Sequence, residues 1–281
     1  MQSNIQGFIG CGASYAEARA VIFGAPFDST TSFRPGTRFG PAAMRSESFG
    51  IETYSPYQDR DLEDIGVFDA GDLDLPFGSA AGALAAIEGA AAEILQDGKI
   101  PVLLGGEHLV TLGAVRAAAK KYPGLRLVHF DAHADLRADY LGETLSHASV
   151  IRRCHDILGD GRIFQFGIRS GSREEMRWSA GRTNMEKFRA DTAGGAAQEI
   201  GGTPVYVTLD LDVIDPAEFP GTGTPEAGGL RFTELLAALL ALRGLDVKAF
   251  DICELAPHYD HSGASTALAC KTLREMLLAY L

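Results

Sequence analysis

Short apolar runs rich in β-branched residues alternate along the chain with longer segments rich in Ala and Leu at helical spacing. Continuous apolar runs are typical of strands buried on both faces, and the longer segments are typical of covering helices. The pattern predicts an α/β fold with a mainly parallel central sheet and helices on both faces. Strands are expected at 20–25, 65–72, 100–106, 125–132, 162–169, 204–213 and 247–255, and helices at 80–97 and about 108–121, 231–243 and 263–280.

The segments between these elements predict one domain. No Pro/Ser-rich linker, charge block or internal repeat divides the 281 residues, so we expect a single domain over 1–281. The Gly- and Arg-rich segment 31–48 is predicted to be a long structured loop that leads into a helix at about 41, and 221–229 a second loop. Ser262 is expected to cap the last helix.

Polar side chains gather where the predicted strands end. Asp131, His133 and Asp135 stand at alternate positions in HFDAHAD, a spacing that places all three on one face of an extended strand. Three further strand ends carry acidic or imidazole side chains: Glu107 and His108, Asp210 and Asp212, and Asp251 and Glu254. Because ligands of open α/β sheets bind outside the carboxyl ends of the strands, we expect these groups to meet in one region.

Anions brought so close require positive charge between them, since they otherwise repel one another and raise each other's pKa. Four aspartates and two histidines predict a site for two divalent ions. Oxygen and imidazole ligands without thiolate favour Mn²⁺, Mg²⁺ or Fe²⁺ over structural zinc. Taken singly, His108 could cap the following helix, His133 could be a satisfied core histidine, and Asp210 or Asp212 could form a turn. The combination favours the metal site.

The net charge and the cysteines limit the binding partners and the thiol chemistry that we expect. A formal net charge of −12 disfavours nucleic acid and anionic membrane surfaces and suits a cationic substrate or a divalent metal. Cys11, Cys154, Cys253 and Cys270 form no Cys-x-x-Cys pair, so we expect buried, inert thiols. The absence of an 18-residue apolar run and of signal-peptide features at the N-terminus predicts a cytoplasmic protein that does not enter membranes.

Five separated motifs resemble those of the ureohydrolase family of arginases and agmatinases, in order and spacing, over nearly the whole chain. They are GGEHLV at 105, DAHADL at 131, SHAS at 146, DLDVIDP at 210 and DICELAP at 251. The flanking segments RPGTRFGP, DLRADYLGETLSH and GTGTPEAGG are most similar to bacterial agmatinases. Leu109 replaces a serine that is common in the family and Ala148 a frequent glycine, so we expect both to alter the shape of the pocket.

The resemblance implies a three-layer α/β/α arginase-like fold, a site for two Mn²⁺ ions and a homo-oligomer, either a trimer or a hexamer. It also implies roles by motif: His147 would transfer protons, and Glu254 would bind the guanidinium group of a substrate. One ion would be held by His108, Asp131, Asp135 and Asp210, and the other by Asp131, His133, Asp210 and Asp212, with Asp131 and Asp210 as bridges.

These residues predict hydrolysis of a guanidino compound to urea and an amine. A water between two divalent ions loses a proton near neutral pH and becomes a nucleophile. The guanidinium carbon is a poor electrophile, so Glu254 is expected to orient it, and Asp135 or His147 to relay a proton to the leaving amine. Two other classes stay open: a two-metal phosphoesterase, which needs Arg or Lys to hold phosphate, and a non-catalytic polyamine-binding protein.

The tail of the substrate is the least determined part. Agmatine is favoured over arginine because Asp139 and Glu143 are expected to attract its ammonium and repel a carboxylate, although both could be solvated loop acids. Arg137 could instead hold the carboxylate of 4-guanidinobutyrate, which makes that acid the alternative substrate.

Three other histidines are expected to lie outside the metal site. His155 is expected on a solvated helix face, and His258 and His261 in a loop or at the mouth of the pocket.

Overall fold

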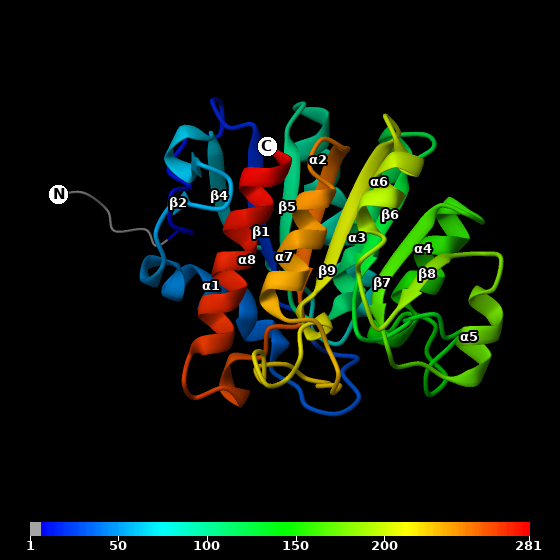
Figure 1. Ribbon diagram of the computed structural model, residues 1–281. Helices are drawn as coiled ribbons and strands as arrows, with labels where there is room; N and C mark the ends of the chain where they lie inside the picture. The colour runs from blue at the N-terminus through cyan, green and yellow to red at the C-terminus, as the bar shows by residue number, and fades with distance from the viewer. Residues whose placement is uncertain (1–6) are drawn as a thin grey trace.

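The computed structural model describes residues 7–281, in which eight parallel strands form one sheet (Figure 1). Residues 1–6, on which part of the signal-peptide prediction depends, lie outside the described residues. Every pairing in this sheet is parallel. In spatial order the strands are β4 (Val67–Asp72), β1 (Ala20–Ala25), β5 (Ile100–Gly105), β10 (Asp246–Cys253), β9 (Pro204–Asp210), β6 (Arg126–Phe130), β7 (Ile163–Ile168) and β8 (Asn184–Lys187).

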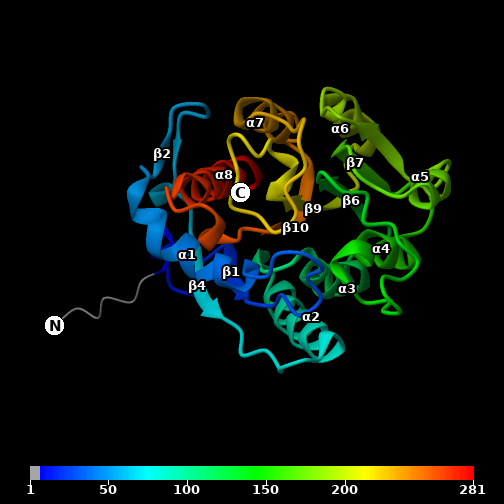
Figure 2. The same ribbon diagram turned by 90° about the horizontal axis from the view of Figure 1, so that it is seen from below.

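Helices cover both faces of the sheet, as the view along the strands shows (Figure 2). One face carries α1 (Gly40–Glu47), α8 (Ala264–Tyr280), α7 (Phe232–Ala241) and α6 (Ala193–Ile200). The other carries α2 (Ala80–Gln96), α3 (Thr111–Lys121) and α4 (Val150–Leu158). The short α5 (Arg173–Ser179) flanks the β8 end, and β2 (Tyr54–Ser55) pairs with β3 (Arg60–Asp61) outside the main sheet. The predicted α/β/α fold with a parallel sheet is confirmed.

The central strands are buried on both faces because two apolar cores sandwich them. One core contains Leu235 of α7 and Leu273 of α8, and the other contains Ile87 of α2 and Val115 of α3, each at most 1% exposed. Within residues 7–281 no helix is long and apolar enough to cross a membrane.

The apolar runs predicted seven of the main strands, but three helices and the eighth strand were missed. The sequence of β8, NMEK, is short and polar, as an edge strand can be, so it gives no apolar run. The prediction that Ser262 is the N-cap of α8 was wrong: Gly263 takes that position with a φ of 76°. Ser262 instead accepts a hydrogen bond from the Ala264 N–H within the preceding turn.

Candidate metal centre and cavity

The strands point their carboxyl ends to one edge of the sheet, where loops enclose a cavity of about 350 Å³. The loops that follow β1, β5, β6, β7, β9 and β10 all contribute to its lining, and Figure 2 views the molecule from this edge. Polar and acidic side chains from four neighbouring strand ends therefore meet, as the topology rule for open parallel sheets requires.

The prediction that Asp131, His133 and Asp135 lie on an extended strand was wrong. Strand β6 ends at Phe130, and the chain then turns away in a loop. His133 forms an isolated bridge with Ser170, and Asp135 takes a left-handed conformation with a φ of 53°. Asp212 was predicted to lie within the strand 204–213, but β9 ends at Asp210 and Asp212 lies in the 3-10 turn that follows.

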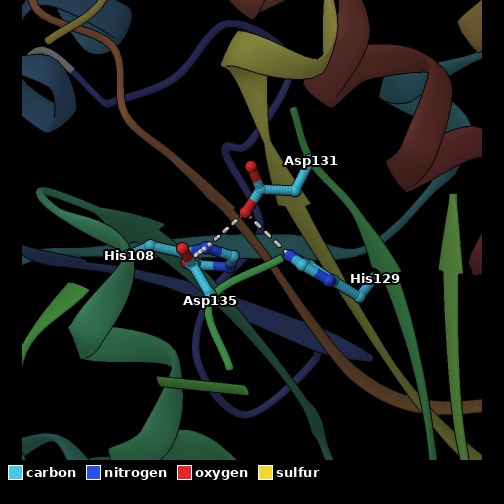
Figure 3. A group of neighbouring side chains, drawn as sticks. All are labelled: His108, His129, Asp131 and Asp135. Carbon is cyan, nitrogen blue, oxygen red and sulfur yellow. Dashed lines mark hydrogen bonds and ion pairs between the residues drawn. The ribbon is translucent and has the colours of Figure 1, made fainter. Parts of the chain in front are cut away.

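The loop after β6 nevertheless brings its acids to the imidazole of His108 (Figure 3). The Nδ1 atom of His108 lies 3.1 Å from Oδ2 of Asp131 and 3.1 Å from Oδ2 of Asp135. Oδ2 of Asp210 is 3.5 Å from the same nitrogen. All four side chains are buried. Ligand atoms of His108, Asp131 and Asp135, together with one of His129, lie close enough to one another to hold a cation, and Asp210 borders this first potential site.

A second cluster shares Asp131 with the first. Nδ1 of His133 lies 3.0 Å from Oδ2 of Asp212 and 3.5 Å from Oδ1 of Asp131. The carboxylate of Asp131 therefore directs Oδ2 towards His108 and Oδ1 towards His133. One oxygen for each imidazole is the arrangement that a bridging ligand needs.

The electrostatics of this region favour added positive charge. Burial raises the pKa of Asp210, and repulsion from Asp212 and Asp131 raises it further, well above the usual range. Burial and repulsion from Asp131 raise the pKa of Asp135 to about 7. The donor atoms are carboxylate oxygens and imidazole nitrogens, which suit hard or borderline divalent cations, so the residues present fit a binuclear centre.

His129 is a neighbour of this centre that the sequence analysis did not single out. Its Nε2 lies 2.8 Å from Oδ2 of Asp131. The side-chain amide of Gln165 donates to the Ala134 carbonyl and lies 3.1 Å from Nδ1 of His129, so Nδ1 accepts and Nε2 carries the proton. Burial lowers the pKa of His129, which keeps the ring neutral. His129 therefore supports Asp131 as a hydrogen-bond donor.

Asp251 lies behind His108 and does not face the cavity. It accepts hydrogen bonds from Tyr206 and Thr208, both at 2.6 Å. Because the Thr208 hydroxyl donates to Asp251, it can only accept from Nε2 of His108, 2.9 Å away. Asp251 thereby fixes the tautomer in which Nδ1 of His108 has its lone pair free for a cation.

Glu254 lines the cavity immediately after β10, in a left-handed conformation with a φ of 67°. It is 6% exposed, and its Oε1 accepts the backbone N–H of His108 at 2.8 Å. Burial raises its pKa well above the usual range, and repulsion from Asp212 and Glu107 adds to the effect. A cationic ligand in the cavity would stabilise its ionised form.

His147 lines the cavity from the 3-10 turn that precedes α4. Its Nε2 lies 3.2 Å from the hydroxyl of Ser32, and its Nδ1 lies 3.5 Å from the hydroxyl of Thr30. Burial lowers the pKa of His147 to about 4, and the charge of His133 lowers it as well. The ring is therefore neutral at pH 7, with one protonated nitrogen.

The residues predicted to bind the tail of a substrate divide into two groups. Arg137 lines the cavity, with its guanidinium carbon 4.8 Å from the centre of the Tyr140 ring and its Nε 3.8 Å from Oε2 of Glu175. Asp139 and Glu143 are exposed and do not line the cavity. Glu175 is a buried cavity acid that the sequence analysis missed, because it stands on α5, outside all the motifs.

Two substitutions noted in the sequence differ in their position. Ala148 lines the cavity, whereas Leu109 is fully buried in the core beneath it.

The three remaining histidines lie outside the lining of the cavity. His258 and His261 are exposed, with His258 against the ring of Phe39. The ring of His155 packs edge-on against Trp178, and its Nε2 lies 2.7 Å from Asp160, so it is less solvated than expected.

The fold and the site together define a class: an α/β/α protein with two adjoining carboxylate–imidazole clusters for divalent cations at the carboxyl edge of its sheet. Comparison with known proteins is more specific. The model of the arginase family matches residues 18–279, and the chain therefore belongs to the arginase family.

Named relatives and solved structures agree with this assignment. The chain is 47% identical over 277 residues to an agmatinase of Bacillus subtilis, covering 97% of this chain and 96% of that one. It is 36% identical to a guanidinobutyrase of Pseudomonas aeruginosa, over 92% of this chain and 85% of the relative. The structure of the agmatine ureohydrolase of Thermoplasma volcanium superposes with a TM-score of 0.88 at 34% identity, covering 99% of this chain and 95% of that chain.

Proposed function

We propose that this protein is an agmatinase, which hydrolyses agmatine to putrescine and urea at a binuclear manganese centre. The observation that carries the proposal is the position of Glu254, a buried carboxylate that lines the same cavity as the paired clusters of His108 and His133. A guanidinium group bound to Glu254 would lie beside those clusters. The resemblance of the whole chain to named agmatinases supports the same activity.

The family motifs, supported by the geometry of the site, suggest which residues would hold the two ions. One ion would be bound by His108, Asp131, Asp135 and Asp210, and the other by Asp131, His133, Asp210 and Asp212. The division of the two Asp131 oxygens between the two imidazoles supports its bridging role. When bound, the ions lower the pKa of water towards neutrality and so supply hydroxide.

The protein's own groups orient the substrate and move a proton. The planar guanidinium would pair with the carboxylate of Glu254, which fixes the carbon for attack. A carbon–oxygen bond forms, the bond from that carbon to the alkyl-bearing nitrogen breaks, and that nitrogen takes a proton that originates from the water. His147 and Asp135 both line the cavity and are the candidates for passing this proton.

The far wall of the cavity bears on the choice of substrate. Arg137 is the one Arg or Lys among the cavity-lining side chains of residues 7–281, and it lies near the acid of Glu175. That acid offsets the charge of Arg137, which leaves the cavity acidic overall and favours the ammonium of agmatine. Exposed Asp139 and Glu143 add negative charge only at a distance, through solvent.

Arg137 also supports the second candidate substrate. A guanidinium in the cavity wall could bind the carboxylate of 4-guanidinobutyrate, and a guanidinobutyrase is among the relatives. The same scarcity of basic residues argues against a two-metal phosphoesterase, because a phosphate would face several acids. A non-catalytic polyamine-binding protein would bind agmatine without turnover.

Urea release from agmatine, arginine and 4-guanidinobutyrate, measured under identical manganese loading, tests the proposal. We expect kcat/KM for agmatine to exceed that for arginine by about a thousandfold, because an unpaired buried carboxylate costs several kcal/mol. Arg137→Gln should change kcat/KM for agmatine little and abolish residual turnover of 4-guanidinobutyrate. A preference for either acid, or binding without urea release, contradicts the assignment. Higher activity with Mg²⁺ or Fe²⁺ than with Mn²⁺ contradicts the choice of metal.

We further propose that residues 1–281 form one domain of a cytoplasmic homo-oligomer, a trimer or a hexamer. One sheet takes its strands from Ala20 to Cys253, which supports the single domain. The four cysteines are buried and free, as suits a reducing compartment. Light scattering on the purified protein tests the assembly, and the mass of a single chain would contradict it.

A further inference from the structure

Beside the cation clusters, the buried carboxylate of Glu107 holds the loop that follows β1. Oε2 of Glu107 accepts the backbone N–H of Thr30 at 2.8 Å and the hydroxyl of Thr31 at 3.2 Å. Oε1 accepts the hydroxyl of Thr30 at 2.5 Å. The side chain of Glu107 is fully buried, so these three hydrogen bonds are its link to the loop rather than a surface contact.

The backbone strengthens this attachment. The N–H of Glu107 donates to the carbonyl of Phe27 at 2.8 Å. A Cβ atom on Gly106 would lie 2.1 Å from that carbonyl oxygen, so only glycine allows the two segments to approach so closely. The position of Thr30 relative to the end of β5 is therefore fixed by main-chain and side-chain contacts together.

Thr30 also contacts the proposed proton-transfer residue. Its hydroxyl oxygen accepts the backbone N–H of His147 at 3.1 Å and lies 3.5 Å from Nδ1 of the ring. A threonine hydroxyl has one proton, and that of Thr30 is donated to Glu107. Towards the ring of His147 the oxygen can therefore only accept, which requires that Nδ1 carries the proton of the neutral imidazole.

We propose that Glu107 and Thr30 are positioning residues that hold His147 as its Nδ1–H tautomer, with the lone pair of Nε2 available for proton transfer. Its consequence for catalysis rests on the proposed function. In this tautomer the lone pair of Nε2 accepts a hydrogen bond from the Ser32 hydroxyl, 3.2 Å away. The Thr30 hydroxyl thus donates its proton to the Glu107 carboxylate and accepts the Nδ1–H of His147, which leaves Nε2 of the ring without a proton.

Glu107→Gln should reverse this order. The amide oxygen of the new side chain would take the place of Oε2, because two donors, the Thr30 N–H and the Thr31 hydroxyl, face that position. The amide NH₂ would then face the Thr30 hydroxyl and donate to it. That hydroxyl would be free to donate to Nδ1 of His147, which favours the Nε2–H tautomer.

Histidine ¹⁵N NMR of magnesium-loaded protein reports the tautomer directly. We choose pH 8.5, at which carboxyl groups are ordinarily ionised and imidazole rings are ordinarily neutral. The signals of His147 are assigned by their loss in His147→Asn. We expect a protonated Nδ1 in the wild type and a protonated Nε2 in Glu107→Gln. A protonated Nε2 in the wild type, or no change in Glu107→Gln, would overturn the inference.

Kinetics of the manganese-loaded protein give the second readout. Thr30→Val removes the hydroxyl at constant shape and should lower kcat for agmatine about ten- to a hundredfold, with KM and manganese content within about threefold of wild type. Thr30→Ser should restore kcat. Thr31→Val is the matched control, because Thr31 reaches Glu107 but not His147, and its kcat should stay within about threefold.

Wild-type kcat in Thr30→Val, or equal losses in Thr30→Val and Thr31→Val, would show that the loop contributes packing alone and would overturn the role of Thr30. Failure of the proposed function is distinguishable. In that case wild-type protein releases no urea from agmatine, whereas the tautomer of His147 is still read from the NMR spectrum.

Discussion

Replacement of Glu254 by glutamine tests the assignment of the guanidinium-binding group. The carboxylate is 6% exposed and accepts one hydrogen bond, from the backbone N–H of His108. Among the described residues it forms no ion pair, and repulsion from Asp212 and Glu107 adds to the effect of burial in raising its pKa. A bound guanidinium would form an ion pair with it.

The magnitude follows from that environment. A hydrogen bond to a charged group contributes about 1.5–3 kcal/mol, or roughly ten- to a hundredfold in kcat/KM. Because Glu254 is buried and forms no ion pair with a side chain among the described residues, we expect a loss near the upper value, about a hundredfold. The glutamine oxygen can still accept the His108 N–H, so both ions should remain bound.

The assay is kcat/KM for agmatine with manganese content measured on the same samples. Glu174→Gln is the matched control, since Glu174 is an exposed acid in the first turn of α5 and undergoes the same chemical change. Near-wild-type turnover of metal-loaded Glu254→Gln would refute the role of the charge. Loss of manganese from this variant would instead show that the substitution lowers kcat/KM by disturbing the cation centre.

Three further outcomes are expected. Asp131→Ala should lose both ions, because its two oxygens face the two imidazole clusters, and elemental analysis that finds two ions retained would refute the bridge. Chelation should lower Tm by about 10 °C, since an ion at a thousand times its dissociation constant stabilises by about 4 kcal/mol and each kcal/mol shifts Tm by about 2–4 °C; calorimetry with manganese added back checks this. Because burial raises the pKa of Cys154 and of the other three thiols, a disulfide reagent at pH 8 should label none in the native protein and all four after denaturation.

The sequence predicted seven main strands and the acidic and imidazole side chains that gather at their ends because both signals are local. Apolar runs mark buried strands, and each cluster residue stands within a few positions of a strand end. The partners of those residues are distant in the sequence. Gln165 is 36 residues from His129, and Glu107 is 77 residues from Thr30, so no spacing rule connects them.

Local spacing also failed to give the direction of side chains in loops. Asp139 and Glu143 follow the DAHADL motif closely in sequence, yet both are exposed, whereas Glu175 reaches the cavity from α5. His129 had a usable signal, because it continues the alternation of Asp131 and His133 by one step towards the N-terminus. Its role as a donor required the orientation of the Gln165 amide, which only the structure provides.

The acids of HFDAHAD show how a sequence spacing can predict neighbouring side chains through the wrong local structure. On an extended strand, four residues span about 13 Å, so Asp131 and Asp135 would share a face but could not share a ligand. In the structure both place Oδ2 3.1 Å from the same Nδ1 of His108. The chain must therefore turn back between them, and the left-handed φ of 53° at Asp135 belongs to that turn. Such a conformation is costly for a residue with a side chain. It persists here because the carboxylates of Asp131 and Asp135 can meet at His108 only if the chain turns, and an extended strand does not turn.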